Sequence, residues 1–311
     1  MFEPGFFSSG PVHIACVVGS IVAIVSGVVG VFTVMRGQSF AGHSLADVAT
    51  AGGSGAFLAG VSPLFGFVAG GVAGAGAMEM IGVSRARGRD LATGIVLGAS
   101  IGLAALFLYL GTTRSSTTGA SQQILFGSIF SIVSSTIPVV ALLSVLCVGI
   151  MALVHRPLLL SSVSTDMAAA RGVPVRVVGL LYMLALALAV GLSSLAIGAI
   201  LSTALLIGPA AIALRLTKRI GWAMVTACVT GVGAVLLGVL LAYDSYYWSS
   251  SHAYWPVSFF IVVAIFLGYL VTELPFIRTS TTRRNETRAS TAPDLDSMSR
   301  VGSGQSAGPT R

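Results

Sequence analysis

Long apolar runs separated by short polar stretches recur along almost the whole chain. Most have about 20 residues, enough for a helix to cross a hydrocarbon core of about 30 Å. We predict nine such spans, at residues 13–35, 43–61, 64–83, 91–111, 135–154, 175–194, 196–216, 220–243 and 255–274. Because every backbone amide in lipid must be hydrogen-bonded within the protein, these runs predict an all-α fold, a polytopic transmembrane helical bundle of about eight or nine spans. The count would be eight if two segments were fused or one lay flat.

The polar segments between the spans differ in character. The Ser/Thr-rich segment 112–121 leads into QQILFGSIFS, which is too short to span and is typical of an interfacial or re-entrant piece. The triplet His155-Arg156-Pro157 closes the fifth predicted span. Residues 279–311 are rich in Ser, Thr, Arg, Gly and Pro. We therefore expect a transmembrane domain over residues 1–278 and a disordered cytoplasmic tail over 279–311.

Composition supports the membrane assignment. Hydrophobic residues make up 55% of the 311 residues and charged residues only 9%, whereas a soluble domain is about one-quarter charged. The 38 glycines suit helices that pack closely in lipid. The net charge of +7 comes from basic residues scattered singly between apolar runs, without interleaved aromatics. This pattern favours a lipid membrane as the environment and no nucleic-acid partner.

Loop charge predicts the orientation, because cytoplasmic loops carry the excess of Lys and Arg. With nine spans, most basic residues fall on one side, and Arg114 falls on the other. The opposite side also receives SYYWSSSHAYW, whose aromatic residues suit a membrane interface. We expect a multi-pass protein of a bacterial plasma membrane, with its N-terminus outside and its C-terminus in the cytoplasm.

Two ionisable residues within a predicted span are the main functional candidates. His43 and Asp47 are four residues apart and so share one face of a helix. Ionisable groups inside a membrane are costly and are usually functional. An imidazole and a carboxylate suit zinc, manganese or ferrous iron. The alternative is a His/Asp hydrogen bond that only supports packing. Asp244, at the end of a span, is expected to be a solvated cap.

Several catalytic motifs are absent from the sequence. It contains no G-x-x-x-x-G-K-[S/T] phosphate loop, no H-E-x-x-H and no G-x-S-x-G. The chain is therefore not expected to be an enzyme, and any ATP hydrolysis would fall to a partner subunit. The polar segment 161–176 instead predicts a brief surface helix, with Thr165 as N-cap ahead of Asp166 and Gly172 near its end. Such a helix could dock a partner or serve as a plain connector.

Five ordered stretches resemble the metal-transporting ABC permeases, which carry zinc, manganese or ferrous iron into bacteria. They are GVVGVFTVMRGQSFAGHSLADVATAGG, GRDLATGIVLG, TDMAAARGVPVR, LAIGAILSTALLIGPAAIALRLT and YYWSSSHAYWPVSFFIV. Members of that family carry Asp and then His at the start of the second span. Here the order is exchanged, to His43 and then Asp47.

The resemblance implies partners and roles. It implies a cytoplasmic ABC ATPase, an extracytoplasmic metal-binding protein and a second permease copy, which makes a homodimer. It also implies a transported divalent metal ion as cargo, with no permanently bound cofactor. The short helix then resembles the family's ATPase-coupling element, whose residues here are Thr165, Asp166, Ala170, Arg171 and Gly172.

Two other readings of the sequence remain open. An ABC permease for a siderophore or cobalamin-like chelate would share the many-helix plan, but would need a wide path and no metal-ligating side chains. A stand-alone secondary transporter or a membrane-embedded scaffold would need no ATPase. Copurification with a nucleotide-binding subunit would distinguish the two ABC permease hypotheses from a stand-alone transporter or scaffold.

Overall fold

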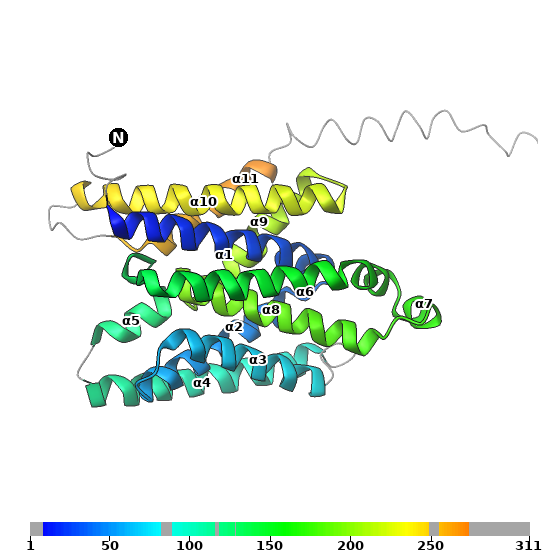
Figure 1. The fold of residues 1–311 in the computed structure, drawn as a ribbon, viewed down its shortest axis with the longest axis horizontal. Coiled ribbons are helices and arrows are strands. Elements are labelled where there is room, and N and C mark those ends of the chain that lie inside the picture. The colour runs from blue at the N-terminus through cyan, green and yellow to red at the C-terminus, as the bar shows by residue number, and fades with distance from the viewer. Residues whose placement is uncertain (1–8, 82–88, 116–117, 128, 249–254, 274–311) are drawn as a thin grey trace, which may run out of the picture. The chain divides into compact units, whose positions relative to one another are not determined.

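The computed structural model describes residues 9–81, 89–115, 118–127, 129–248 and 255–273. Within these ranges the chain forms α-helices and two short 3-10 turns, without a strand (Figure 1). The chain divides into two units, Met1–Tyr269 and Leu270–Arg311, and only Leu270–Glu273 of the second is described. The predicted boundary at residues 278 and 279 and the predicted disordered tail lie outside the described residues.

The helical bundle is confirmed. Among the described helices, six are long and apolar enough to cross a membrane. They are α1 (Gly10–Met35), α3 (Pro63–Ile81), α4 (Arg89–Ser115), α6 (Ile137–Val163), α8 (Val175–Ile197) and α10 (Ile220–Trp248). Two shorter apolar helices, α9 (Ser202–Leu216) and α11 (Val257–Glu273), correspond to the seventh and ninth predicted spans. The second predicted span corresponds to α2 (Ser39–Leu58), which has 20 residues but is not among these six helices.

Two predicted boundaries, near Pro157 and near Gly198, are wrong. Helix α6 continues through Pro157 to Val163 instead of closing at Val154. A proline removes only one backbone donor, and transmembrane helices tolerate that loss. The seventh span begins at Ser202 instead of Ala196, because Gly198 has a φ of 90° and ends α8. The expected interfacial piece is helix α5 (Thr118–Phe126), followed by short 3-10 turns.

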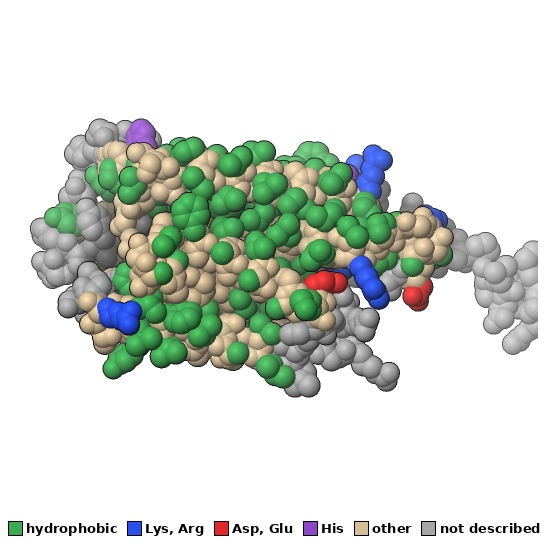
Figure 2. All heavy atoms as spheres, turned by 60° about the horizontal axis from the view of Figure 1, so that its bottom comes forward, with side chains coloured by type: hydrophobic (Ala, Val, Ile, Leu, Met, Phe, Trp, Pro, Cys, Tyr) green, Lys and Arg blue, Asp and Glu red, His purple; other side chains and the backbone are tan. Residues whose placement is uncertain are grey.

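The surface agrees with a membrane-spanning body. Figure 2 shows hydrophobic side chains over most of the visible face, with coloured charged side chains toward its two ends. Large apolar side chains such as Leu142, Val145 and Leu153 of α6 are more than two-thirds exposed. In water such exposure would be unfavourable, whereas in lipid it costs nothing.

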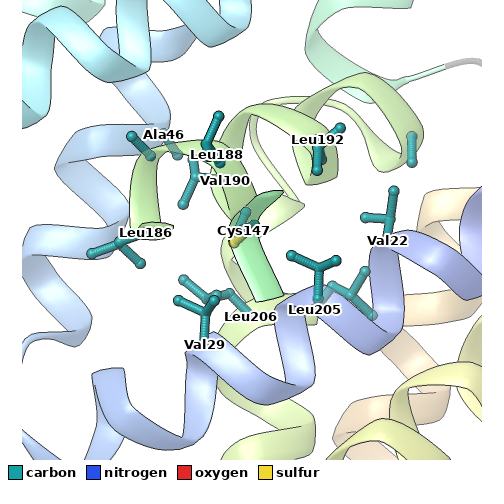
Figure 3. Packing of buried hydrophobic residues seen from close by; sticks show 14 of the residues in the cluster. Val22, Val29, Ala46, Cys147, Leu186, Leu188, Val190, Leu192, Leu205 and Leu206 are labelled. Carbon is teal, nitrogen blue, oxygen red and sulfur yellow. The ribbon is translucent and has the colours of Figure 1, made fainter. Parts of the chain in front are cut away.

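Helix α8 lies at the centre of the packing and contacts α1, α2, α3, α6 and α9. Leu186 and Leu192 of α8 are fully buried, and so are Leu205 and Leu206 of α9 (Figure 3). Cys147 lies among these side chains and donates its thiol to the Ala185 carbonyl at 3.2 Å. A helix that is apolar on all sides belongs inside a bundle, and α8 meets this condition.

Close glycine contacts join α2 to α3. A β-carbon at Gly52 would lie 2.8 Å from the Gly70 α-carbon, and one at Gly70 would lie 2.9 Å from the Gly52 α-carbon. Because no real side chain tolerates such contacts, the two backbones pack directly on each other. This packing fixes the rotation of α2, and hence the direction in which its polar residues face.

Candidate functional site

The turn between α1 and α2 places the start of the candidate site. Gly37 has a φ of 62°, the Gln38 amide donates to the Thr33 carbonyl, and the Gly37 amide donates to the Val34 carbonyl. These two bonds form a Schellman motif, which terminates α1 sharply. Helix α2 therefore begins at Ser39, one turn earlier than predicted. At 1.5 Å per residue, His43 and Asp47 lie about 6 Å and 12 Å from its start.

The structure brings His43 and Asp47 together on one face of α2. The distance from His43 Nε2 to Asp47 Oδ2 is 3.9 Å, which is too long for a hydrogen bond. Asp47 Oδ2 is buried and has no hydrogen-bond partner in the described part of the chain. Two ligands of one transition-metal ion stand roughly 3 to 3.5 Å apart, given metal-ligand distances of about 2.1 Å. Only a small closure of the pair would allow both groups to bind the same ion.

The exposure of the pair is unusual for the interior of a membrane. The side chain of His43 is 43% exposed and that of Asp47 is 16% exposed, so both open onto one side of α2. A charged group facing lipid costs several kcal/mol, roughly 2.5 to 3.5 on insertion scales. This side of α2 must therefore face water, a cargo ion or another protein surface.

Two polar residues that sequence reasoning missed extend the same face. Thr50 and Ser54 follow Asp47 by three and seven residues, which returns them to the face of His43. Both are buried, and the Ser54 hydroxyl has no hydrogen-bond partner among the described residues. The helical spacing of Thr50 and Ser54 from His43 was the signal that could have found them. Together the four residues form a polar stripe along α2.

The described residues supply an incomplete set of metal ligands. Among the described residues, no group of three or more His, Cys, Asp or Glu side chains comes together. A tetrahedral transition-metal site has about four ligands, and the α2 pair supplies two. Any complete site would need ligands in addition to this pair.

The second candidate region is helix α7 (Thr165–Ala170), which joins α6 to α8. Its N-cap is Ser164, whose side chain accepts a 3.2 Å hydrogen bond from the Met167 amide. The prediction of Thr165 as N-cap was therefore wrong by one residue, since Thr165 is already the first helical residue. Ser164 takes this role because its backbone is extended, as an N-cap requires.

The end of α7 has the geometry expected of an exposed docking element. Gly172 has a φ of 76°, and the Val173 amide donates to the Ala168 carbonyl, which makes a second Schellman motif. Asp166, Ala170 and Arg171 are all exposed. Ala168 is fully buried and anchors the helix. In Figure 1, α7 projects beyond the ends of α6 and α8.

A joint made of backbone connects α5 to the break between α8 and α9. The Ala199 and Ile200 amides donate to the Ile124 and Leu125 carbonyls, both at 3.2 Å. A β-carbon at Gly127 would come within 2.5 Å of the Gly198 nitrogen, and both glycines have positive φ angles. Only two glycines can pass this closely in these conformations. The joint lies at the end of α8 opposite to α7.

Asp244 differs from its predicted role. It lies in the last part of α10 and is only 8% exposed, so it is not a solvated cap. Its Oδ1 atom is buried and lacks a hydrogen-bond partner among the described residues. A buried, incompletely paired carboxylate is unfavourable unless a cation or proton satisfies it. Asp244 therefore joins Asp47 as a candidate ligand, at the far end of the bundle from α7.

Comparison with known proteins identifies related chains. A family model described as the ABC 3 transport family matches residues 11–272. The manganese transport system membrane protein MntC of Halalkalibacterium halodurans is 31% identical over 219 residues, which are 70% of this chain and 74% of that protein. MntC of Listeria innocua is 28% identical over 243 residues, which are 78% of this chain and 85% of that protein.

A solved structure shares the fold. PsaBC from Streptococcus pneumoniae in complex with Fab superposes with a TM-score of 0.73 at 23% sequence identity. The match covers 86% of this chain and 92% of the other chain. The overall fold described above is thus shared with a solved structure.

Proposed function

The chain belongs to the ABC 3 transport family, and from this premise we propose that it is the membrane-spanning permease subunit of an ABC importer for divalent transition-metal ions. Manganese is the favoured cargo, because the matched relatives are named manganese transport proteins. In this role the chain performs no chemistry on its cargo. It provides the path, and a separate subunit supplies the energy.

The observation that carries this proposal is the His43/Asp47 pair. It is partly open on α2, within the helical bundle, and its atoms stand 3.9 Å apart without a hydrogen bond between them. A pair that served only packing would be expected to close this bond. Imidazole and carboxylate are ligands for Mn²⁺, Zn²⁺ and Fe²⁺ alike, so the pair defines the class of ion. The preference for manganese rests on the relatives.

A second copy of the chain would complete the site. The open side of α2 needs a partner surface, and a two-fold axis would set the pair of one copy against the pair of the other. Two histidines and two aspartates would then supply about four ligands. The proposal makes the homodimer a requirement of the transport path.

The neighbouring helix α4 offers a surface for that contact. Gly94, Gly98 and Gly102 recur every four residues, and a β-carbon at any of them would meet no atom within 4 Å. Such small-residue stripes let membrane helices approach closely. Because Ser44 contacts Thr93 and Gly55 contacts Phe107, α2 and α4 run parallel. At about 100° per residue, the glycine stripe and the His43/Asp47 pair then face the same side.

Coupling to an ATPase is assigned to α7. Its exposed residues Asp166, Ala170, Arg171 and Gly172 would dock on the ATPase, with Thr165 at the start of the helix. The ends of α1, α6 and α9 that carry Arg36, Arg156 and Arg215 would face the cytoplasm with it, in line with the excess of positive charge. ATP binding and hydrolysis on the partner would shift the bundle between outward-open and inward-open states. An extracytoplasmic metal-binding protein would deliver the ion to the other side.

The decisive test is metal uptake by the assembled complex. The chain is reconstituted with its ATPase and binding protein in liposomes, and uptake of Mn²⁺, Zn²⁺, Fe²⁺ and a ferric siderophore is compared. We expect Mn²⁺ uptake that needs ATP and that disappears in the His43→Ala, Asp47→Ala double variant. Uptake that survives in the double variant would show that the site is elsewhere. Uptake of the siderophore instead of free ions would show that the cargo is a metal chelate and not a divalent ion.

The dimer has a separate test. Gly98→Leu places a large side chain on the open stripe, where a β-carbon would meet no described atom within 4 Å, so the monomer should fold normally. We expect the copies to separate on size-exclusion chromatography in detergent. The matched control is Gly149→Leu, at another exposed glycine with no neighbouring atom within 4 Å. The control should leave the dimer intact.

A further inference from the structure

Arg36 binds three elements of the bundle at once. Its Nη1 atom donates to the hydroxyls of Ser161 and Ser162 at the end of α6, both at 3.2 Å. Its Nε atom donates to Gln38 Oε1 at 3.3 Å, within the turn that leads into α2. Its guanidinium Cζ lies 5.3 Å from the ring centroid of Tyr182 on α8. A single side chain thus contacts α6, α8 and the start of α2.

The partners of Arg36 are themselves held firmly. The hydroxyls of Ser161 and Ser162 donate to the Leu158 carbonyl at 3.0 and 2.6 Å, which leaves their lone pairs for the arginine. Tyr182 is fully buried and donates its hydroxyl to Thr33 Oγ1 on α1 at 3.0 Å. Groups with fixed orientations transmit a displacement better than mobile ones, because they do not absorb it by changing rotamer.

The position of these contacts along the chain connects the two candidate regions. Ser161 and Ser162 lie three and two residues before Ser164, the cap of α7. Tyr182 lies on the helix that follows α7. Arg36 is the C-cap of α1, and α2 begins three residues later and carries His43 one turn further on. The arginine therefore connects both flanks of α7 to the start of α2.

We propose that Arg36 is the positioning residue that couples α7 to the metal-ligating pair on α2. When α7 moves with its ATPase, the ends of α6 and α8 move with it, and the Arg36 side chain carries the movement into the turn before α2. His43 and Asp47 then change depth or rotation together. This inference rests on the proposed function of α7 and of the pair.

The chemistry of arginine suits this role. Its planar guanidinium can donate to two hydroxyls on one edge, donate through Nε on another and stack on an aromatic face. A lysine offers a single ammonium group and cannot make all of these contacts in one geometry. Arg36→Lys should therefore retain only part of the coupling, although the charge is unchanged.

The test follows the accessibility of a reporter cysteine on α2. Phe40, in the first turn of α2, is 46% exposed and is replaced by cysteine after Cys16, Cys147 and Cys228 have been replaced by alanine. The chain is reconstituted with its ATPase, and alkylation by a maleimide is timed with and without a non-hydrolysable ATP analogue. We expect nucleotide to change the rate at least about fivefold, the lower end of common allosteric couplings, when Arg36 is present.

Variants of the arginine and of its partners give the decisive arms. In Arg36→Gln, nucleotide should change the rate less than about twofold, below the usual range of allosteric coupling. The Ser161→Ala, Ser162→Ala double variant should lose the response in the same way. It tests whether the Arg36 contacts transmit the response even if Arg36→Gln folds poorly. Tyr182→Phe keeps the ring and should keep the response. Arg176→Gln, an exposed arginine of α8, is the matched control and should also keep it.

The outcomes separate the inference from the proposed function. A full nucleotide response in both Arg36→Gln and the double-serine variant overturns the inference alone. A reporter that ignores nucleotide even when Arg36 is present shows that α7 does not drive α2, and both ideas then fail. A merely structural arginine would lower the yield of folded protein but leave the response of the surviving molecules unchanged.

Discussion

Helices α2 and α8 lie side by side and have similar lengths, but the bundle uses them differently. In α8, 16 of 23 residues are buried, and five other long or short helices of the bundle pack against it. In α2, 10 of 20 residues are buried, and the open sector holds His43 and Asp47. Their similar length shows that length alone does not separate a helix that carries candidate ligands from one that only supports the packing. They differ because α2 has one exposed side that carries polar residues, whereas α8 does not.

The largest expected effect would break the working role of α2. Asp47→Asn keeps the size of the side chain but removes the charge that would pair with a cation. Loss of a buried charged partner costs about 3 to 5 kcal/mol, so uptake of Mn²⁺ should fall at least about 100-fold. Thermal unfolding in detergent should hardly change, because Asp47 Oδ2 makes no hydrogen bond. Normal uptake by Asp47→Asn would show that the His43/Asp47 pair only supports packing.

The second effect would break the supporting role of α8. Leu186 is fully buried, so Leu186→Ala should leave a cavity and destabilise the fold by about 2 to 5 kcal/mol. Leu180, on the same helix, is 46% exposed, and Leu180→Ala is the matched control with little expected loss. Unfolding followed by circular dichroism in detergent measures both. Equal losses would mean that α8 is not the centre of the packing.

The third effect concerns the glycines that orient α2. Gly52→Ala would push α2 away from α3, because the new β-carbon would lie 2.8 Å from the Gly70 α-carbon. We expect a loss of about 1 to 3 kcal/mol, typical of overpacking. Gly149→Ala makes the same substitution where nothing lies within 4 Å, and should be neutral or slightly stabilising. If Gly52→Ala matched this control, the close contact would not orient α2.

The smallest effect sharpens the comparison at the entrance to α8. Ser164→Ala removes the cap of α7 and should cost about 1 kcal/mol. Because α7 is short and exposed, the loss should stay local, so its amides should exchange with solvent about fivefold faster. The amides of α8 should not change. Faster exchange in both helices would show that α7 and α8 unfold as one unit.

Much of the fold could be predicted from sequence, because apolar length alone identifies a membrane span. Local chemistry could not fix every boundary. Pro157 predicts a helix end in water, yet α6 passes through it to Val163. Gly198 looked like one more small residue in an apolar run, and only the fold gives it the positive φ that ends α8. Such breaks depend on tertiary contacts, which hydropathy does not contain.

The candidate site was partly predictable. The four-residue spacing of His43 and Asp47 was enough to predict that they share a face, and the structure places them there. Sequence could not tell which sector of α2 would remain open, because the glycine packing on α3 decides it. Nor could it foresee the role of Arg36, because its serine partners on α6 lie more than 100 residues away along the chain.

The Gly127/Gly198 joint has a consequence for how freely this chain can vary. Its hydrogen bonds run between backbone atoms, so they survive almost any exchange of the side chains beside them. The two glycines are different, since each leaves no space for a β-carbon on the other. A library randomised over 124–127 and 198–200, selected for growth on scarce metal, should therefore return glycine at 127 and 198 together and a broad mixture elsewhere.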